Sequence, residues 1–331
     1  VGNIYLRDAA GNNTNVGVVT ATAFIPTHGQ LSHRNIIING AMIVSQRGTS
    51  FNQVANNAYT LDRFGLIHPY STHFDVSQST TAPDGFSKSY KLDVNVTDTS
   101  IGTGQFAAIR YRVEARDLQQ LAYGTSSAKP ITVSFYVRSN QTGTYGFNIQ
   151  QADNSDKQVS QTYTINSQDT WERKSFTFAG DTSGQINDDG GIGFNIIWWL
   201  AAGSSYTSGT SRPAWTNYAQ ADSAVGHNVN ILGSTSNNFY ITGVQLEVGS
   251  APTPFEHRSF GDELSRCQRY FQRLGGGSSY HVIASGFLRE TTQTFGQGYF
   301  TTRMRASPGA PTMNASPITT DRSHFDQTIS T

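Results

Sequence analysis

The sequence predicts an all-β protein built as a jelly-roll β-sandwich. Alternation of apolar and polar residues with period two recurs along the chain between clusters of Gly, Asn, Asp and Ser, which indicates half-buried strands joined by turns. Helical spacing of apolar residues occurs in only two short stretches. With 331 residues, the chain is long enough to bury a large core in such a body.

The predicted strands differ in their apolar pattern. The stretch 193–200 is almost continuously apolar, which predicts a central strand, whereas the alternation of 239–248 slips at 242–244 and predicts a bulge at Gly243. The strands expected in the main body are residues 36–44, 86–96, 106–113, 131–137, 171–178, 193–200 and 239–248.

One amphipathic helix is marked by its cap. Ser259 is a candidate N-cap with Asp262 three residues later, and a run of glycines at 275–277 would end the helix. Its apolar positions follow at spacings of four and three residues: Phe260, Leu264, Cys267, Phe271 and Leu274. A shorter helix is expected at 114–123, before Gly124.

These signals divide the chain into three parts. Residues 1–34 are too poor in large apolar groups to bury a core and are expected to form a connector that other subunits order. Residues 35–258 form the jelly-roll body, and residues 259–331 form the helix and a small C-terminal β-segment with strand-like stretches at 280–289 and 298–305. A chain beginning with Val1 and ending on a polar run is expected to be part of a longer or processed polypeptide.

Charge and cysteine content argue against several functions. Charged residues make up 14% of the chain, with 23 basic and 23 acidic residues and no basic run, so no nucleic-acid partner is expected. The most apolar stretch, 192–202, is far shorter than the ~20 residues that span a membrane, so no membrane insertion is expected. The single cysteine, Cys267, precludes an internal disulfide and is most simply a small buried apolar residue.

The search for catalytic or metal-binding motifs assigns no catalytic residue and no metal ligand, so the protein is not expected to be an enzyme. His68 and His73 lie five residues apart, which suits neither a strand face nor a helix pair. Asp181, Asp188 and Asp189 lie in a turn-rich stretch that either forms an ordinary polar turn or supplies oxygen ligands to Ca²⁺, the only cofactor considered.

Aromatic residues give the candidate binding site. Trp199, Tyr206, Trp215 and Tyr218 fall within the end of one strand and the Ser/Gly/Thr-rich loop after it, where exposed rings beside small polar groups could stack on sugars. On a strand Trp198 and Trp199 point to opposite faces, so at least one belongs to the core. Packing of the loop on the sheet is the alternative use of these rings.

Several segments, in order, resemble a domain that recurs in tail-fibre and other virion proteins of bacteriophages, those of marine phages especially. The resemblance covers most of the chain. The matching segments are VGVVTATAF (16–24), NIIINGAMIVSQRGTSF (35–51), YTLDRF (59–64), GFSKSYKLDV (85–94), LQQLAYGTSSAKPITVSFYVRSNQTGTY (118–145), LAAGSSYTSGT (200–210), ITGVQLEVGSAPTPFEHRSFGDELSRCQRYFQRL (241–274) and YFTTRMRASPGAPT (299–312).

This resemblance implies a jelly roll similar to carbohydrate-binding modules, carried on a homotrimeric fibre of the virion. The implied partners are copies of the chain itself, other tail or capsid proteins, and a host cell-surface glycan; no catalytic residues are implied. The alternatives are a head-decoration or other tail component with a purely structural role, and a binding module associated with a depolymerase.

Overall fold

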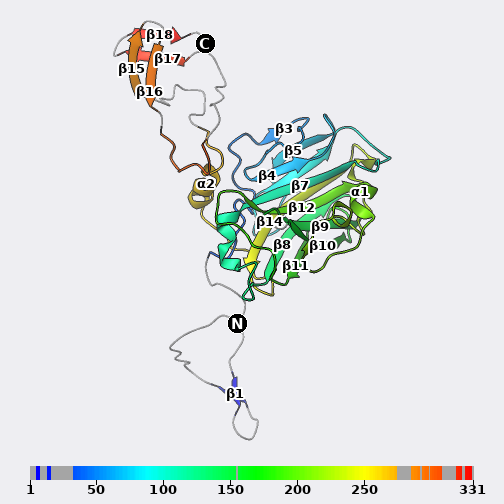
Figure 1. Ribbon diagram of the computed structural model, residues 1–331. Coiled ribbons are helices and arrows are strands. Elements are labelled where there is room, and N and C mark those ends of the chain that lie inside the picture. Colours follow the sequence, from blue (N-terminus) through cyan, green and yellow to red (C-terminus); the bar gives the residue numbers. More distant parts are fainter. Residues whose placement is uncertain are drawn as a thin grey trace.

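The computed structural model describes residues 33–153, 156–273 and 299–307, together with the backbone of six short strands outside these ranges. The main body is a sandwich of two six-stranded sheets in which all paired strands are antiparallel (Figure 1). The protein is therefore an all-β jelly-roll sandwich with few helices, as the sequence predicts. In the part of the chain that the structure describes, no helix is long and apolar enough to cross a membrane.

The first sheet, called here the β12 sheet, has β12 near its middle, with β9 on one side and β7 on the other. Both faces of β12 are covered, since its residues are buried almost without interruption, and this confirms the central position predicted for 193–200. In sheet order, the strands are β13 (Thr216–Asn217), β10 (Lys157–Ile165), β9 (Gly143–Gln151), β12 (Ile192–Ala202), β7 (Phe106–Glu114) and β4 (Phe64–Ile67).

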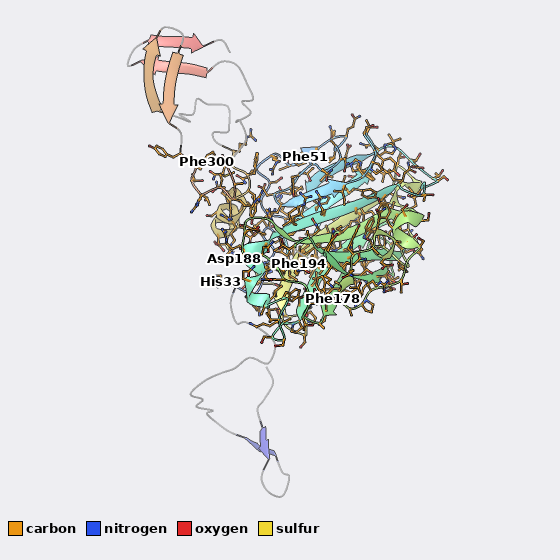
Figure 2. All side chains as sticks on the ribbon, in the orientation of Figure 1. His33, Phe51, Phe178, Asp188, Phe194 and Phe300 are labelled. Atoms are coloured by element: carbon orange, nitrogen blue, oxygen red, sulfur yellow. The ribbon has the colours of Figure 1, made fainter. Side chains whose placement is uncertain are left out.

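The second sheet, the β14 sheet, packs against the first through a shared core of aromatic and aliphatic side chains. Phe178 and Phe194, from the two different sheets, both lie within the sandwich (Figure 2). In sheet order, the strands are β11 (Glu172–Phe178), β8 (Ile131–Ser139), β14 (Asn238–Val248), β6 (Ser89–Val94), β5 (Phe74–Ser79) and β3 (Ser50–Phe51).

The bulge predicted in β14 is present. The register between β14 and β8 shifts between Thr242 and Gln245, and Gly243 has a φ of 61°. A Cβ atom at Gly243 would lie 2.8 Å from ring atoms of both Phe86 and Tyr136, so the close approach of two rings adds to the backbone reason for glycine here.

The strand predicted at 36–44 is wrong. Asn39 and Met42 have positive φ values of 62° and 58°, which break an extended chain into turns. The Asn39 side chain satisfies the backbone groups that a neighbouring strand would otherwise bond. Its amide donates to the Val44 carbonyl, and its oxygen accepts from the Val44 N–H. Gly40 lies so close to β14 that an added Cβ would overlap the Val244 carbonyl oxygen.

The helices are shorter than predicted. The first is a 3-10 helix, η1 (Ala115–Leu121). The second, α2 (Phe260–Gln268), has the predicted cap, since the Ser259 hydroxyl accepts from the Asp262 N–H at 3.2 Å, but it ends before Phe271. Phe260 was predicted to lie on the apolar face of this helix, but its side chain is 57% exposed. The remaining helices are α1 (Ser204–Thr207), η2 (Gln220–Asp222) and η3 (Ile231–Gly233).

Helix α2 packs directly against the sandwich. Cys267 is fully buried against Ile38 and Val44, as expected for a small apolar side chain, and burial raises the pKa of its thiol. Glu114 at the end of β7 accepts two hydrogen bonds from Arg269 and one from Tyr270. The boundary placed at residue 258 stays a prediction.

Outside the body, the described backbone forms short antiparallel pairs. The connector predicted at 1–34 falls almost wholly outside the described residues, apart from its two strands. The strand predicted at 298–305 is wrong for residues 299–305, which are irregular. The pairs are β1 (Tyr5–Arg7) with β2 (Asn13–Asn15), β15 (Ser285–Glu290) with β16 (Gln293–Gln297), and β17 (Ile318–Arg322) with β18 (Phe325–Ile329).

Candidate functional site

The two tryptophans of β12 point to opposite faces of the sheet, as strand alternation requires. Trp198 is fully buried in the core between the sheets. Trp199 faces outward but is only 3% exposed, and its indole N–H donates to Asn148 Oδ1 at 2.9 Å. Both indoles therefore serve packing in this structure.

The other three predicted site residues follow β12 in the chain, and the structure does not bring all four rings together. Tyr206 packs on Trp199 with ring centroids 5.0 Å apart. Trp215 is half-buried and packs against the edge of the main core instead, stacked on Phe194 at 5.6 Å with its N–H donating to the Ala179 carbonyl. Tyr218 is half-buried, and burial raises the pKa of its hydroxyl. Ligand contact by Trp199, Tyr206, Trp215 and Tyr218 stays a prediction.

A different group of rings lies on the outer face of the β14 sheet. We call Phe86, Tyr136, Phe255 and His257 the aromatic cluster. The ring of Phe86 is its centre, with centroid distances of 5.4 Å to Tyr136, 5.0 Å to Phe255 and 5.1 Å to His257. Phe86, Tyr136 and Phe255 are half-buried and His257 is exposed, so ring surface remains open to solvent.

Three separate parts of the chain build the aromatic cluster. Tyr136 lies on β8 between Phe135 and Val137, which are fully buried, so alternation turns its ring outward. Phe86 comes from the loop between β5 and β6. The segment that carries the other two rings folds back over β14, because the Glu247 carboxylate accepts from the Thr253 N–H and hydroxyl at 2.9 and 2.6 Å.

A groove of about 320 Å³ adjoins the aromatic cluster. Beneath it, the Arg258 guanidinium donates to Glu263 at 2.6 Å and to the Ile37 carbonyl, so this wall is tied to neighbouring backbone. Burial would raise the pKa of Glu256, but hydrogen bonds from the Asn35 and Arg34 backbone and the charge of Arg258 outweigh it and lower that pKa. The lining residues are Ala41, Ile43, Gly85, Phe86, Ser87, Phe255, Glu256, His257, Arg258 and Glu263.

The same face carries further aromatic side chains beside the cluster. Tyr240 on β14 also points outward, and Trp171 meets it edge to face at 6.0 Å. The Arg138 guanidinium lies 4.9 Å from the Tyr240 ring centroid and pairs with Asp169 at 2.8 Å. Rings beside charged and amide groups can bind a sugar through ring stacking and hydrogen bonds.

The sequence interpretation missed the aromatic cluster because it looked for aromatics close together in the chain. The sequence did contain one indication: Tyr136 and Tyr240 occupy positions of their strands where the apolar–polar alternation predicts an outward-facing polar residue. Phe86 and Phe255 lie in loops, and no periodic signal places them near Tyr136.

The candidate metal positions do not converge. Asp181 is buried and accepts from the Ser183 N–H and hydroxyl, whereas Asp188 is exposed and pairs with Arg116 at 3.5 Å (Figure 2). Asp189 accepts from the Gly191 N–H, which is the bonding of an ordinary turn. Among residues 33–153, 156–273 and 299–307, no three His, Cys, Asp or Glu side chains form a metal-binding group. Calcium binding stays untested.

The two histidines at 68 and 73 are separated by a ring. Tyr70 stacks between them, with centroids 6.2 Å from His68 and 4.5 Å from His73. Burial lowers the pKa of His68 to about 4, so its imidazole is neutral at pH 7.

No family model matches the chain, and no curated protein matches it. Similar solved structures include the enzymatically active domain of tailspike protein 4 of bacteriophage CBA120, at 14% identity over 60% of this chain and 21% of that chain, with a TM-score of 0.32. Two carbohydrate-binding modules of Clostridium thermocellum are also similar, each at 11% identity. The family 11 module is matched over 62% of this chain and 99% of its own, with a TM-score of 0.32. The C-terminal family 22 module is matched over 61% and 98%, with a TM-score of 0.33.

Proposed function

We propose that the protein binds a glycan through the aromatic cluster. The observation that carries this proposal is the open ring surface of Phe86, Tyr136 and Phe255 beside a groove lined by charged side chains. Sugar rings present apolar C–H faces and polar edges, so they suit a surface that offers both π-faces and hydrogen-bonding groups.

The rigidity of the groove supports this role. Glu263 accepts from the Asn39 N–H as well as from Arg258, and the Gln245 side-chain oxygen accepts from the Glu256 N–H at 2.8 Å. A wall that is already ordered loses little side-chain entropy when a ligand binds, which favours affinity for a weakly held ligand such as a sugar.

We further propose that binding is the whole of this activity and that the protein is not an enzyme. A glycosidase needs a carboxylic acid whose pKa is raised, paired with a second carboxylate. In the groove beside the aromatic cluster, the pKa of Glu256 is lowered instead, so this carboxylate does not suit the acid role. Release of new reducing ends from a bound glycan by the wild-type chain would contradict this part of the proposal.

The biological setting that we propose is a virion, with the chain as a subunit of a homotrimeric phage tail fibre that meets the host surface. Two observations support this setting: charged residues make up only 14% of the chain, and a series of sequence segments resembles phage fibre proteins in the same order. Light scattering on the full chain tests the oligomer: a mass of three chains is expected, and a stable monomer would contradict the fibre.

A glycan array followed by titration of the best glycan tests the binding site. His257→Ala removes an exposed ring of the cluster and should weaken binding severalfold without a change in thermal unfolding, because little packing is lost. The matched control is Phe260→Ala on α2, an exposed ring outside the groove, which should bind as wild type does. If no glycan binds the wild-type chain, glycan binding itself is wrong.

A further inference from the structure

Two arginines on the outer face of the β12 sheet have no carboxylate partner. Arg110 and Arg112 lie on β7, two residues apart, so both side chains leave the same face of the sheet. Among the described residues, no Asp or Glu oxygen lies within 4.0 Å of either guanidinium. On the opposite sheet, by contrast, Arg138 is paired with Asp169 at 2.8 Å.

Neutral groups are the hydrogen-bond partners described for these two arginines, with Tyr59 also beside Arg110. Arg110 donates to Asn57 Oδ1 at 2.9 Å, and Arg112 donates through Nε to Asn195 Oδ1 at 3.2 Å. These contacts hold the side chains in place and leave the positive charges uncompensated. Burial, and then the like charge of Arg112, lower the pKa of Arg110.

A third guanidinium adds to the positive potential at this corner. Arg63 is buried, donates to the Arg112 carbonyl, and lies 3.4 Å from the Tyr270 ring centroid. The nearby carboxylate of Glu114 is already engaged by Arg269 and Tyr270. Arg63 has no described carboxylate within 4.0 Å, although the charge of Asp117 acts on it at longer range, so Arg110 and Arg112 carry the open positive charge of this corner.

Ring and apolar surface lie next to the two arginines. Gly65 of β4 pairs with Arg110, and a Cβ at Gly65 would lie 3.6 Å from the Tyr59 ring, so that ring covers the strand beside the guanidinium. On the β12 side of β7, Ile197 pairs with Arg110 and packs in one apolar group with Trp199 and Tyr206. Two charges beside the half-buried Tyr59 ring suit a ligand that carries anionic groups on a ring-shaped body.

We propose that Arg110 and Arg112 form a binding site for the carboxylate or sulfate groups of an acidic polysaccharide. The site lies on the opposite sheet from the aromatic cluster and does not depend on glycan binding there. Guanidinium groups bind carboxylate and sulfate oxygens through charge-assisted hydrogen bonds that an amide cannot replace. A nucleic acid is a poorer fit, because phosphate backbones need an extended row of cations and the chain has no basic run.

Surface-immobilised polymers test this site on the full chain: a polyuronate, a sulfated polysaccharide, a neutral polysaccharide and single-stranded DNA. Binding to at least one of the two acidic polysaccharides is expected, with preference over the neutral polymer and the DNA, and it should weaken as salt rises. The two acidic arms distinguish carboxylate from sulfate recognition. Equal or tighter binding to DNA, or no binding to either acidic polymer, would overturn the proposal.

The variants Arg110→Gln and Arg112→Gln keep hydrogen-bonding capacity at each position and remove one charge. Each is expected to weaken binding to the acidic polymer about tenfold. Lys174→Gln on β11 removes one positive charge from an ion-paired residue of the other sheet and should leave that binding unchanged. Unfolding curves confirm that the variants fold. Unchanged binding in both folded β7 variants would overturn this site and leave the aromatic cluster untouched, so the two proposals fail separately.

Discussion

Two regions of the protein are rich in aromatic side chains and use them differently. Trp199, near the end of β12, and Trp215, in the loop that follows, pack against two separate apolar groups. Both indole N–H groups donate hydrogen bonds to acceptors within the protein. In the aromatic cluster, the rings of Phe86 and Tyr136 pack on each other and are half-buried, as Trp215 is, but Phe86 also lines a groove. The two regions therefore differ in what their rings border: the indoles are bonded within the protein, whereas the cluster, built from distant segments, lies beside a groove.

The largest effect should come from Trp199. Trp199→Ala removes an almost fully buried indole and leaves the Asn148 side-chain oxygen without its donor. We expect the free energy of unfolding to fall by about 4 kcal/mol. Urea denaturation at pH 7 measures it, and a loss below about 1 kcal/mol would show that this ring is not part of the packing.

Trp215 should matter less because it is only half-buried. Trp215→Ala removes its stacking on Phe194 and its hydrogen bond to Ala179, and we expect a loss of about 2–3 kcal/mol in the free energy of unfolding. Affinity for a glycan should stay unchanged when measured well below the melting temperature. Lost affinity with unchanged stability would instead make the loop the binding site.

Acid should lower the free energy of unfolding through His227. Burial lowers the pKa of His227 to about 4, and its Nδ1 accepts from the Gly146 N–H. The unfolded state, with a pKa near 6.5, binds the proton first as pH falls, so His227 stabilises the fold above pH 6.5 and this contribution is lost between pH 6.5 and 4.

The expected size of this loss is about 3 kcal/mol in the free energy of unfolding by pH 4. Relative to wild type, His227→Gln should therefore show a weaker decline in stability from pH 7 to pH 4. His33→Gln, at an exposed position, serves as the control and should follow the wild-type curve. Parallel curves for wild type and His227→Gln would contradict the assignment.

The smallest effect on stability should come from the aromatic cluster itself. Tyr136→Ala removes a half-exposed ring, so we expect a loss of at most about 1 kcal/mol in unfolding free energy. Glycan affinity should fall about tenfold, as expected when one stacked sugar ring loses its partner. Calorimetric titration measures it; equal affinity would remove Tyr136 from the site.

Much of the fold could be predicted from the sequence because strand alternation reports burial directly. The strand at 239–248 and its bulge at Gly243, the central strand around 193–200 and the Ser259 cap all depend on local patterns. The 36–44 segment could not, since its apolar run matches a strand and only the Asn39 side chain, bonded to Val44 and Asp62, turns it into a loop.

The candidate site was less predictable for the same physical reason. The cluster joins Phe86, Tyr136 and Phe255 across 169 residues of chain, and a sequence pattern contains no information about which loops meet. Only the outward phase of Tyr136 was available beforehand. The packed state of Trp215 depends equally on a tertiary contact, its stacking on Phe194.

The central claim is that the half-exposed cluster, and not the aromatic loop, contacts a glycan. The most direct test is titration of one array-selected glycan into wild type, Tyr136→Ala and Trp215→Ala under conditions where all three are folded. Affinity is expected to fall about tenfold for Tyr136→Ala and to stay at the wild-type value for Trp215→Ala. Loss of affinity in Trp215→Ala with wild-type affinity in Tyr136→Ala would contradict it.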